Sequence, residues 1–262
     1  MMRRPMRVQE LFDLHGKVAI VTGGATGLGR QMAGALAEAG ADVVVCARKV
    51  ERCERAAQEL RALGVRTLGL RCDVRDREEV QGVVDRTTEE LGRIDILVNN
   101  AGTAWGAPPE EVPLEGWQKV IDVNLTGVFL FAQAVGRTMI ADGRGGKIVN
   151  IASVAGLGGA PAEVMNAIPY HASKGGVIAF TRDLACKWAV HGINVNAIAP
   201  GWFPSDMSRL VLERSPEVVE RIPLKRFGGP DDLKGAILYL SSAASDYVTG
   251  HTLVVDGGQS AW

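Results

Sequence analysis

Tyr170 and Lys174 stand four residues apart in a segment with helical periodicity. Residues at this spacing share one face of a helix, so the phenol and the ammonium are predicted to be neighbours. A phenol with a pKa of about 10 exchanges protons poorly at neutral pH, and a nearby cation favours its ionised form. Lowering that pKa by about three units needs about 4 kcal/mol, much of which a close cation in a partly desolvated site can supply. The pair therefore predicts a proton donor or acceptor that works near neutral pH.

Two further polar residues are placed to complete such a site. Ser153 directly follows the apolar run 147–151. Ligands bind at the carboxyl ends of strands in open α/β sheets, so its hydroxyl is expected to hold a substrate oxygen. Asn124 interrupts a long apolar helical segment, which indicates a purpose other than packing. Taken alone, Tyr170 could be a core aromatic and Lys174 a solvated helix residue; Ser153, Asn124 and a glycine-rich turn favour the chemical interpretation.

The glycine-rich turn is Thr22-Gly-Gly-Ala-Thr-Gly-Leu-Gly29, between the first apolar run and the first helical segment. Gly23, Gly27 and Gly29 let backbone approach a ligand closely, and the free N–H groups at a helix start suit a pyrophosphate. The alternative is a plain structural turn. The position of the glycines, after a strand and before a helix, favours a dinucleotide site.

The residue that reads the adenosine ribose is expected about 20 positions later. Arg48 stands there, followed by Lys49, whereas Asp42 lies at the wrong end of its strand to serve NAD. A guanidinium can grip the 2′-phosphate of NADP. We therefore expect NADP(H), with NAD(H) possible; the alternative is that Arg48 and Lys49 only begin a solvated helix.

Short β-branched runs alternate with longer helix-period segments along the chain. Continuous rather than alternating apolar runs indicate strands buried on both faces, and no hairpin signal occurs, so we predict an α/β fold with a seven-stranded parallel sheet covered by helices on both faces. The predicted strands are 18–22, 43–46, 67–72, 95–99, 147–151, 194–198 and 252–255, and the predicted helices are 27–39, 50–63, 76–91, 116–141, 170–191 and 231–243.

One domain over 1–262 is expected, since no Pro-, Ser- or charge-rich linker divides the chain. Residues 1–16 are predicted to be an N-terminal tail. The stretch from about 202 to 230 breaks the strand–helix rhythm, and an irregular excursion of that size usually covers a site.

Composition excludes several classes of protein. Of 262 residues, 47% are hydrophobic and 23% charged, as in soluble domains, and the net charge of −1 gives no basic surface for nucleic acid or an anionic membrane. The four cysteines form no C-x-x-C pair and the four histidines no metal-ligand spacing, so we expect reduced packing cysteines and no metal. Without a signal peptide or a run of about 18 apolar residues, a soluble, cytoplasmic protein is expected.

Five motifs occur in order: the glycine-rich turn, Asn99-Asn-Ala-Gly102, Asn124, Ser153 and Tyr170-x-x-x-Lys174. Together they resemble the short-chain dehydrogenase/reductase family over nearly the whole chain. The resemblance implies a single-domain Rossmann fold with a doubly wound sheet, a homotetramer, and a catalytic set of Asn124, Ser153, Tyr170 and Lys174. In it Asn124 anchors a water linked to Lys174. It also implies cofactor contacts from Gly23, Thr26, Gly27, Leu28, Gly29, Arg48, Lys49, Asp73, Val74, Asn100, Ala101, Gly102, Tyr170, Lys174, Pro200, Gly201, Phe203 and Ser205.

The substrate side departs from the usual family pattern. Ser153 and Tyr170 are 17 residues apart, which lengthens the loop 156–169, and Trp202, Phe203 and Pro204 make the following stretch bulky. These features look most like the gluconate 5-dehydrogenase-like branch, whose members also carry 3-oxoacyl reductase labels. An aromatic pocket rim argues mildly for an acyl or cyclic ketone over a hydroxylated sugar acid. Candidate cations for an anionic substrate are Arg209, Arg214 and Lys225, and candidate pocket residues are Met165 and Met207.

A non-catalytic dinucleotide sensor on the same fold is the alternative from a different class of protein. A sensor has no need of Ser153, Tyr170 and Lys174 together, so the enzyme is favoured. The predicted helices 116–141 and 170–191 are apolar beyond one stripe, for example at Phe129 and Phe180, which is expected of helices that also pair between subunits.

Overall fold

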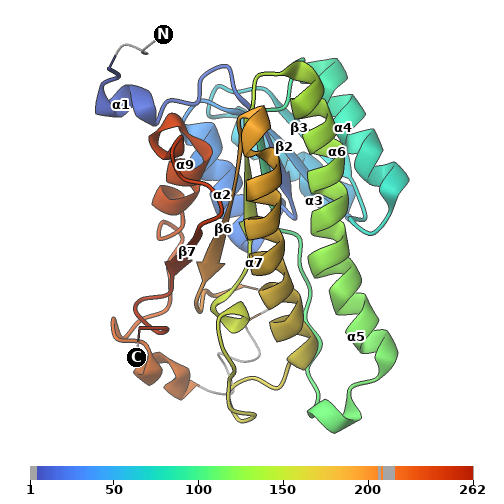
Figure 1. Ribbon diagram of the computed structural model, residues 1–262, viewed down its shortest axis with the longest axis vertical. Helices are drawn as coiled ribbons and strands as arrows, with labels where there is room; N and C mark the ends of the chain where they lie inside the picture. The colour runs from blue at the N-terminus through green and yellow to red at the C-terminus, as the bar shows by residue number, and fades with distance from the viewer. Residues whose placement is uncertain (1–4, 206–207, 209–215, 262) are drawn as a thin grey trace.

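Seven apolar runs form one sheet in which every neighbouring pair of strands is parallel, in the order β3-β2-β1-β4-β5-β6-β7. The computed structural model describes residues 5–205, 208 and 216–261 (Figure 1). The order reverses between β1 and β4, which is where open α/β sheets bind ligands. The predicted doubly wound α/β fold is confirmed. The strands are β1 (Val18–Thr22), β2 (Asp42–Ala47), β3 (Thr67–Arg71), β4 (Ile96–Asn99), β5 (Gly146–Ile151), β6 (Ile193–Pro200) and β7 (Thr252–Val255).

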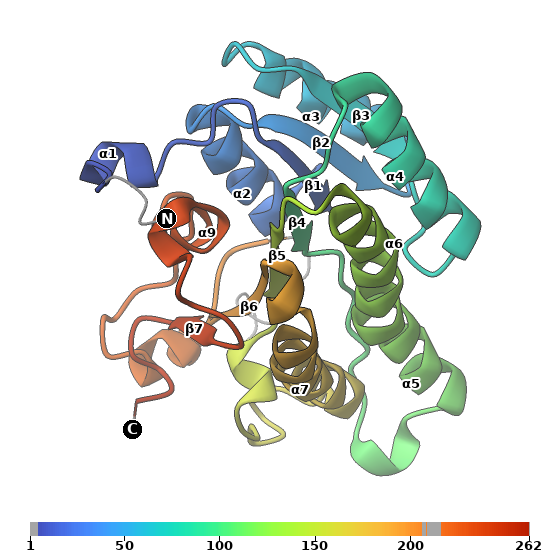
Figure 2. The ribbon, with the colours of Figure 1, turned by 45° about the horizontal axis from the view of Figure 1, so that its top comes forward.

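Helices cover both faces of the sheet and bury two separate apolar layers. Figure 2 shows α2 and α9 on one side and α4, α6 and α7 on the other, and α3 contributes to the same layer as α2. Because both faces are covered, all five residues of β1 are buried. The helices are α1 (Val8–Leu11), α2 (Gly27–Glu38), α3 (Val50–Arg61), α4 (Arg77–Leu91), α5 (Leu114–Ile121), α6 (Gly127–Asp142), α7 (Ile168–Trp188) and α9 (Lys234–Ser241).

Several predicted boundaries are wrong by a few residues, and the predicted tail contains the short helix α1. The last predicted helix, 231–243, is shorter at both ends, and 3-10 turns at 243–245 and 189–191 follow α9 and α7. A further 3-10 turn, Pro216–Arg221, lies within the irregular stretch after β6.

The largest departure from the predicted elements is in the segment 116–141. It is two α-helices, α5 and α6, joined by a π-helical turn over Asp122–Thr126, in which the N–H of Gly127 bonds to the carbonyl of Asp122. A π turn inserts one residue into the helical ladder and often lies at a functional site. Asn124 occupies this turn and is fully buried.

The joined segment Leu114–Asp142 is long and apolar enough, by length and composition, to cross a membrane. Polar residues interrupt it, so it contains no unbroken apolar run of that length. Half of its most apolar window is buried inside the fold, where α6 packs on β4, β5 and α4. Packing against the sheet and α4 therefore accounts for the buried part of its apolar composition.

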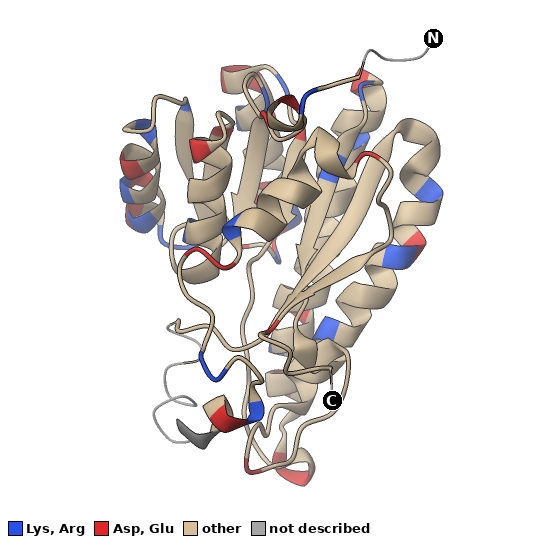
Figure 3. Cartoon of the chain, turned by 90° about the vertical axis from the view of Figure 1, so that its left-hand side faces the viewer, with Lys and Arg blue, Asp and Glu red and all other residues tan. Residues whose placement is uncertain are grey.

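The cysteines and the charged residues are distributed as the sequence indicates. Cys46, Cys53 and Cys72 are buried free thiols, as predicted for packing residues, whereas Cys186 is exposed. Figure 3 shows acidic and basic residues interspersed on the helices, as the net charge of −1 suggests. Within 5–205, 208 and 216–261, no group of three or more His, Cys, Asp or Glu residues could hold a metal ion.

Candidate active site

The glycine-rich turn after β1 is shaped by close backbone packing. Gly23 has φ +64° and Gly27 φ +53°, both in the left-handed region that favours glycine. A Cβ on Gly29 would lie 2.3 Å from the Gly23 carbonyl oxygen and 2.4 Å from Asn100 Nδ2, so no side chain fits there. Thr26 is the N-cap of α2 but makes no side-chain cap, so the first N–H groups of α2, including those of Gly27 and Leu28, have no capping acceptor. These groups fit a pyrophosphate.

The end of β4 is tied to the end of β1 at the point where the strand order reverses. The backbone N–H groups of Asn100 and Ala101 both donate to Thr22 Oγ1 at 2.9 Å, and Asn100 Nδ2 donates to the Thr22 carbonyl at 2.9 Å. Gly102 follows, and a Cβ there would lie 3.9 Å from Lys174 Nζ. This backbone segment therefore connects the glycine-rich turn to the predicted catalytic lysine.

Basic side chains gather at the ends of β2 and β3. Arg75 holds the Asp73 carboxylate with two nitrogens, Nε at 3.0 Å from Oδ1 and Nη2 at 2.6 Å from Oδ2. This hydrogen bonding lowers the pKa of Asp73, and the charge of Arg48 acts in the same direction. Val74 is buried, and its side chain leaves no room for a Cβ on Gly127.

Arg48 and Lys49 are exposed beside this cluster. No ion pair joins either of them to another residue in the described part of the chain. A free guanidinium and ammonium at this edge of the sheet fit a 2′-phosphate on the adenosine ribose.

Ser153, Tyr170 and Lys174 meet beyond the end of β5. Ser153 is the N-cap of a 3-10 turn, Val154–Gly156, and its Oγ accepts from the N–H of Ala155. Lys174 is 4% exposed; its Nζ donates to the carbonyl of Ile151 at 2.6 Å and lies 5.6 Å from the centre of the Tyr170 ring. The spacing of Tyr170 and Lys174 on α7 thus places both side chains toward the carboxyl end of β5.

Burial controls the ionisation of both groups. Desolvation raises the pKa of Tyr170 above its ordinary value of 10.0, and the hydrogen bond from Ser153 offsets part of this. Desolvation lowers the pKa of Lys174 to about 8. The sequence predicts that Lys174 favours the phenolate of Tyr170. In the chain without a bound dinucleotide, desolvation is the larger effect and acts in the opposite direction.

Asn124 is held by a buried polar network that the sequence analysis missed. Its Oδ1 accepts from the N–H of Thr103 at 2.8 Å, and its Nδ2 donates to the Thr103 carbonyl at 2.9 Å and to Ser173 Oγ at 3.0 Å. Ser173 Oγ in turn donates to the Tyr170 carbonyl at 2.8 Å. Ser173 stands next to Lys174, which is the signal that could have singled it out.

The lengthened loop after Ser153 packs on neighbouring segments. A Cβ on Gly156 would lie 2.6 Å from the backbone of Lys174, so the 3-10 turn rests directly on α7. The carbonyl of Asn166 accepts from the N–H of Ala107 at 2.9 Å, which joins the loop to the segment after β4. Met165 is half-buried in this loop.

The stretch after β6 differs from the aromatic rim that was predicted. Phe203 is 5% exposed and packs in the core, where its ring fills the space beside Gly228. Its ring is therefore not available to line a ligand pocket, and its carbonyl accepts from Ser208 Oγ at 2.6 Å. Gly201 lies against Asp256, and Ser205 lies beside the glycine-rich turn, 3.7 Å from where a Cβ on Gly27 would be.

Of the candidate cations for an anionic substrate, Lys225 already has partners. Lys225 is engaged by the carbonyl of Glu220 and, at 3.3 Å, by its carboxylate. Met207, Arg209 and Arg214 lie outside the described residues. The imidazole Nδ1 of His171, the residue next to Tyr170, lies 3.1 Å from the Ala167 carbonyl, which indicates a structural role.

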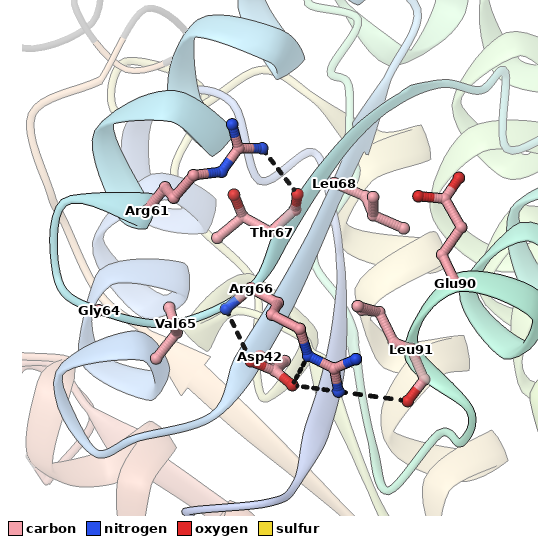
Figure 4. A pocket seen from close by; sticks show the side chains of 9 residues that line it. All are labelled: Asp42, Arg61, Gly64, Val65, Arg66, Thr67, Leu68, Glu90 and Leu91. Carbon is pink, nitrogen blue, oxygen red and sulfur yellow. Dashed lines mark hydrogen bonds and ion pairs between the residues drawn. The ribbon is translucent and has the colours of Figure 1, made fainter.

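A pocket at the opposite edge of the sheet is shown in Figure 4. It lies at the starts of β2 and β3, where Arg66 pairs with Asp42 and Arg61 donates to the Thr67 carbonyl. These polar groups already have partners. The carboxyl edge, with its free N–H groups and converging side chains, is the candidate site.

Comparison with known proteins agrees with this geometry. The family model described as "Enoyl-(Acyl carrier protein) reductase" matches residues 23–260. The chain is 45% identical over 250 residues to a 2-dehydro-3-deoxy-D-gluconate 5-dehydrogenase of Escherichia coli, covering 94% of this chain and 96% of the relative. It is 39% identical over 247 residues to a 3-oxoacyl-[acyl-carrier-protein] reductase of Synechocystis, covering 94% and 97%.

Solved structures show the same fold. A gluconate 5-dehydrogenase from Burkholderia cenocepacia, in complex with NADP and tartrate, superposes with a TM-score of 0.92 at 39% identity, covering 98% of this chain and all of that one. The chain therefore belongs to the short-chain dehydrogenase/reductase family, the NAD(P)-dependent oxidoreductases that interconvert alcohols and ketones.

Proposed function

We propose that this protein is an NADP(H)-dependent enzyme, built as one domain, that interconverts a secondary alcohol and a ketone on a sugar acid of the gluconate type. The observation that carries the proposal is the meeting of Ser153, Tyr170 and Lys174 at the carboxyl edge of β5, beside a turn that fits a dinucleotide. The bound dinucleotide supplies or accepts the hydride.

The residues of this chain orient the substrate and transfer the proton. The Ser153 hydroxyl donates a hydrogen bond to the substrate oxygen and orients it toward Tyr170. Because burial raises the pKa of Tyr170, the phenol keeps its proton at neutral pH, which is the form that donates to a ketone oxygen. The Lys174 ammonium, fixed by the Ile151 carbonyl, favours the phenolate that remains after transfer. Asn124 binds the backbone of Thr103 and so holds the segment after β4, which passes close to this lysine at Gly102.

Arg48 supports NADP(H) over NAD(H). It stands at the end of β2 without an ion-pair partner among residues 5–205, 208 and 216–261, and Lys49 lies next to it. An acidic residue, which would accept from the ribose 2′-hydroxyl of NAD, is absent at this position of the sequence. The Burkholderia relative was solved with NADP, which agrees with this preference.

A sugar acid is favoured over an acyl thioester because the E. coli relative, a gluconate-type dehydrogenase, is more similar than the thioester reductase. The aromatic rim expected from Trp202, Phe203 and Pro204 would disfavour a hydroxylated substrate. The Phe203 ring packs in the core and does not contribute to that rim.

We infer a cytoplasmic homotetramer acting on a small molecule rather than on nucleic acid or at a membrane. Phe129, on the outer side of α6, is 41% exposed, and its ring meets that of Phe180 on α7 edge to face at 6.4 Å. An apolar aromatic pair at the surface of two neighbouring helices is suited to burial against a second subunit.

The first experiment measures initial rates of NADPH and NADH oxidation with 5-keto-gluconate and, separately, with an acetoacetyl thioester. Turnover of the sugar acid with NADPH is expected. Turnover of the thioester alone would assign the protein to the acyl reductases, and a preference for NADH would contradict the role given to Arg48.

Tyr170→Phe separates the enzyme from the dinucleotide sensor. The variant is expected to bind NADPH as the wild type does, measured by calorimetry, while losing nearly all turnover. A sensor would show no turnover before the substitution and unchanged dinucleotide binding after it.

A further inference from the structure

Two hydroxyls on α7 make nearly identical buried hydrogen-bond networks, but only one is next to the catalytic lysine. Ser173 is 0% exposed; it accepts from Asn124 Nδ2 at 3.0 Å and donates to the Tyr170 carbonyl at 2.8 Å. Thr181 is also 0% exposed; it accepts from Asn150 Nδ2 at 2.9 Å and donates to the Val177 carbonyl at 2.8 Å.

Two contacts with Thr103 fix which way the Asn124 amide points, and that orientation decides how Ser173 is bonded. Nδ2 has acceptors on Thr103 and Ser173, and Oδ1 has a donor in the N–H of Thr103. A reversed amide would place Oδ1 against the Thr103 carbonyl and Nδ2 against the Thr103 N–H, so the two Thr103 contacts set the orientation. In that orientation Nδ2 donates to Ser173 Oγ, and the Ser173 hydroxyl proton is left for the Tyr170 carbonyl.

The same network joins the π turn to the helix that carries the acid. Asn124 Oδ1 and Lys174 Nζ lie on the same side of Gly102, 3.6 and 3.9 Å from the position of a Cβ there. Ser173 connects them, because it precedes Lys174 in the chain and bonds to Asn124 on one side and to the Tyr170 carbonyl on the other. A shift of the π turn relative to α7 therefore moves the surroundings of the ammonium and of the phenol together.

We propose that Ser173 is a positioning residue for proton transfer, which locks the π turn around Asn124 to the face of α7 that bears Tyr170 and Lys174. This proposal rests on the function proposed above. Without the Ser173 hydroxyl, the lysine is held less precisely against the phenolate, so Tyr170 becomes harder to ionise.

The test compares Ser173→Ala with the matched control Thr181→Val, which removes an equally buried hydroxyl two turns further along α7. For Ser173→Ala, kcat is expected to fall about five- to tenfold, with the KM for NADPH unchanged. The limb of the kcat–pH profile that reports Tyr170 moves to higher pH in both reaction directions. Thr181→Val is expected to lose a similar amount of stability while keeping the wild-type kcat and profile.

A second readout needs no turnover. The phenolate absorbance of Tyr170, obtained as the difference between each protein and the same protein carrying Tyr170→Phe, is titrated without substrate. In Ser173→Ala the transition is expected at higher pH than in wild type and in Thr181→Val. Equal transitions and equal kcat in the two variants would overturn the proposal.

Two further outcomes stay distinguishable. If Ser173→Ala does not fold, Ser173→Cys, which keeps the volume with a weaker donor, carries the same comparison. If the wild type reduces no ketone while the absorbance transitions differ as expected, the proposed function fails and the positioning of Tyr170 by Ser173 stands.

Discussion

The Lys174 ammonium is buried in a site where desolvation lowers its pKa to about 8. The unfolded lysine has a pKa of about 10.4. Between these two values the unfolded chain binds more protons than the folded one, so the contribution of Lys174 to stability rises with pH across that window. Below pH 8 the folded protein bears the cost of a buried charge.

Lys174→Met is therefore expected to abolish turnover yet stabilise the fold at pH 7 by about 1–2 kcal/mol, after allowing for the Ile151 carbonyl left without a donor. Urea unfolding of both proteins at pH 7 and pH 10 checks this, and the difference should close at the higher pH. A difference that stays constant with pH would mean that the burial of the charge is not its source.

At the adenosine end, Arg48→Ser is expected to weaken NADPH binding about 10- to 100-fold, because one or two charge-assisted hydrogen bonds are lost. Binding of NADH, which has no 2′-phosphate, should be unchanged when both are measured by calorimetry. An equal loss for the two dinucleotides would assign Arg48 to the shared part of the cofactor.

Among the elements, the 3-10 turn after Ser153 has a position that depends on Gly156. A Cβ on Gly156 would lie 2.6 to 2.8 Å from backbone atoms of Lys174 and Gly175, which cannot yield as a flexible side chain does. A Cβ on Gly158, two residues later in the exposed loop, meets nothing within 4 Å.

Gly156→Ala is therefore expected to push Ser153 away from Tyr170 and to lower kcat by roughly 100-fold, the effect of a misplacement of about 1 Å. Gly158→Ala should keep the wild-type kcat. Steady-state kinetics of the pair, with unfolding temperatures as a check on folding, decide between a local displacement and general destabilisation. Similar kcat values in the two variants would show that the close contact of Gly156 with α7 does not set the position of Ser153.

How far the sequence predicts these elements depends on the range of the interactions that set them. The strands and the order of the catalytic motifs are predictable because continuous apolar runs and an i, i+4 pair are local signals. The π turn is not, because it is fixed by contacts from Asn124 to Thr103 and Ser173, 21 and 49 residues away. The burial of Phe203 likewise depends on the space left by Gly228, and the raised pKa of Tyr170 depends on how deeply α7 packs.

For the whole molecule, the aromatic pair on α6 and α7 carries the prediction of assembly. Replacing both Phe129 and Phe180 by Glu places charges in the predicted interface and is expected to reduce the proposed tetramer to smaller species in sedimentation velocity. Leu63→Glu, which changes another exposed apolar residue, 48% accessible after α3, is the control and should leave assembly unchanged. A tetramer that survives the double substitution would place the interface elsewhere.

The four thiols lie at different depths, so the rates at which they are alkylated report how different parts of the fold open. Cys186 is exposed, so a thiol-alkylating reagent should modify it at once, whereas Cys53 lies in the apolar layer under α2 and α3, and Cys46 and Cys72 lie in the layer on the other face of the sheet. The three buried thiols become reactive only as their layer opens. The order in which they are labelled would therefore report which face of the sheet opens first. The decrease in their labelling rates when NADPH is added would measure how much a bound dinucleotide stabilises each face against opening.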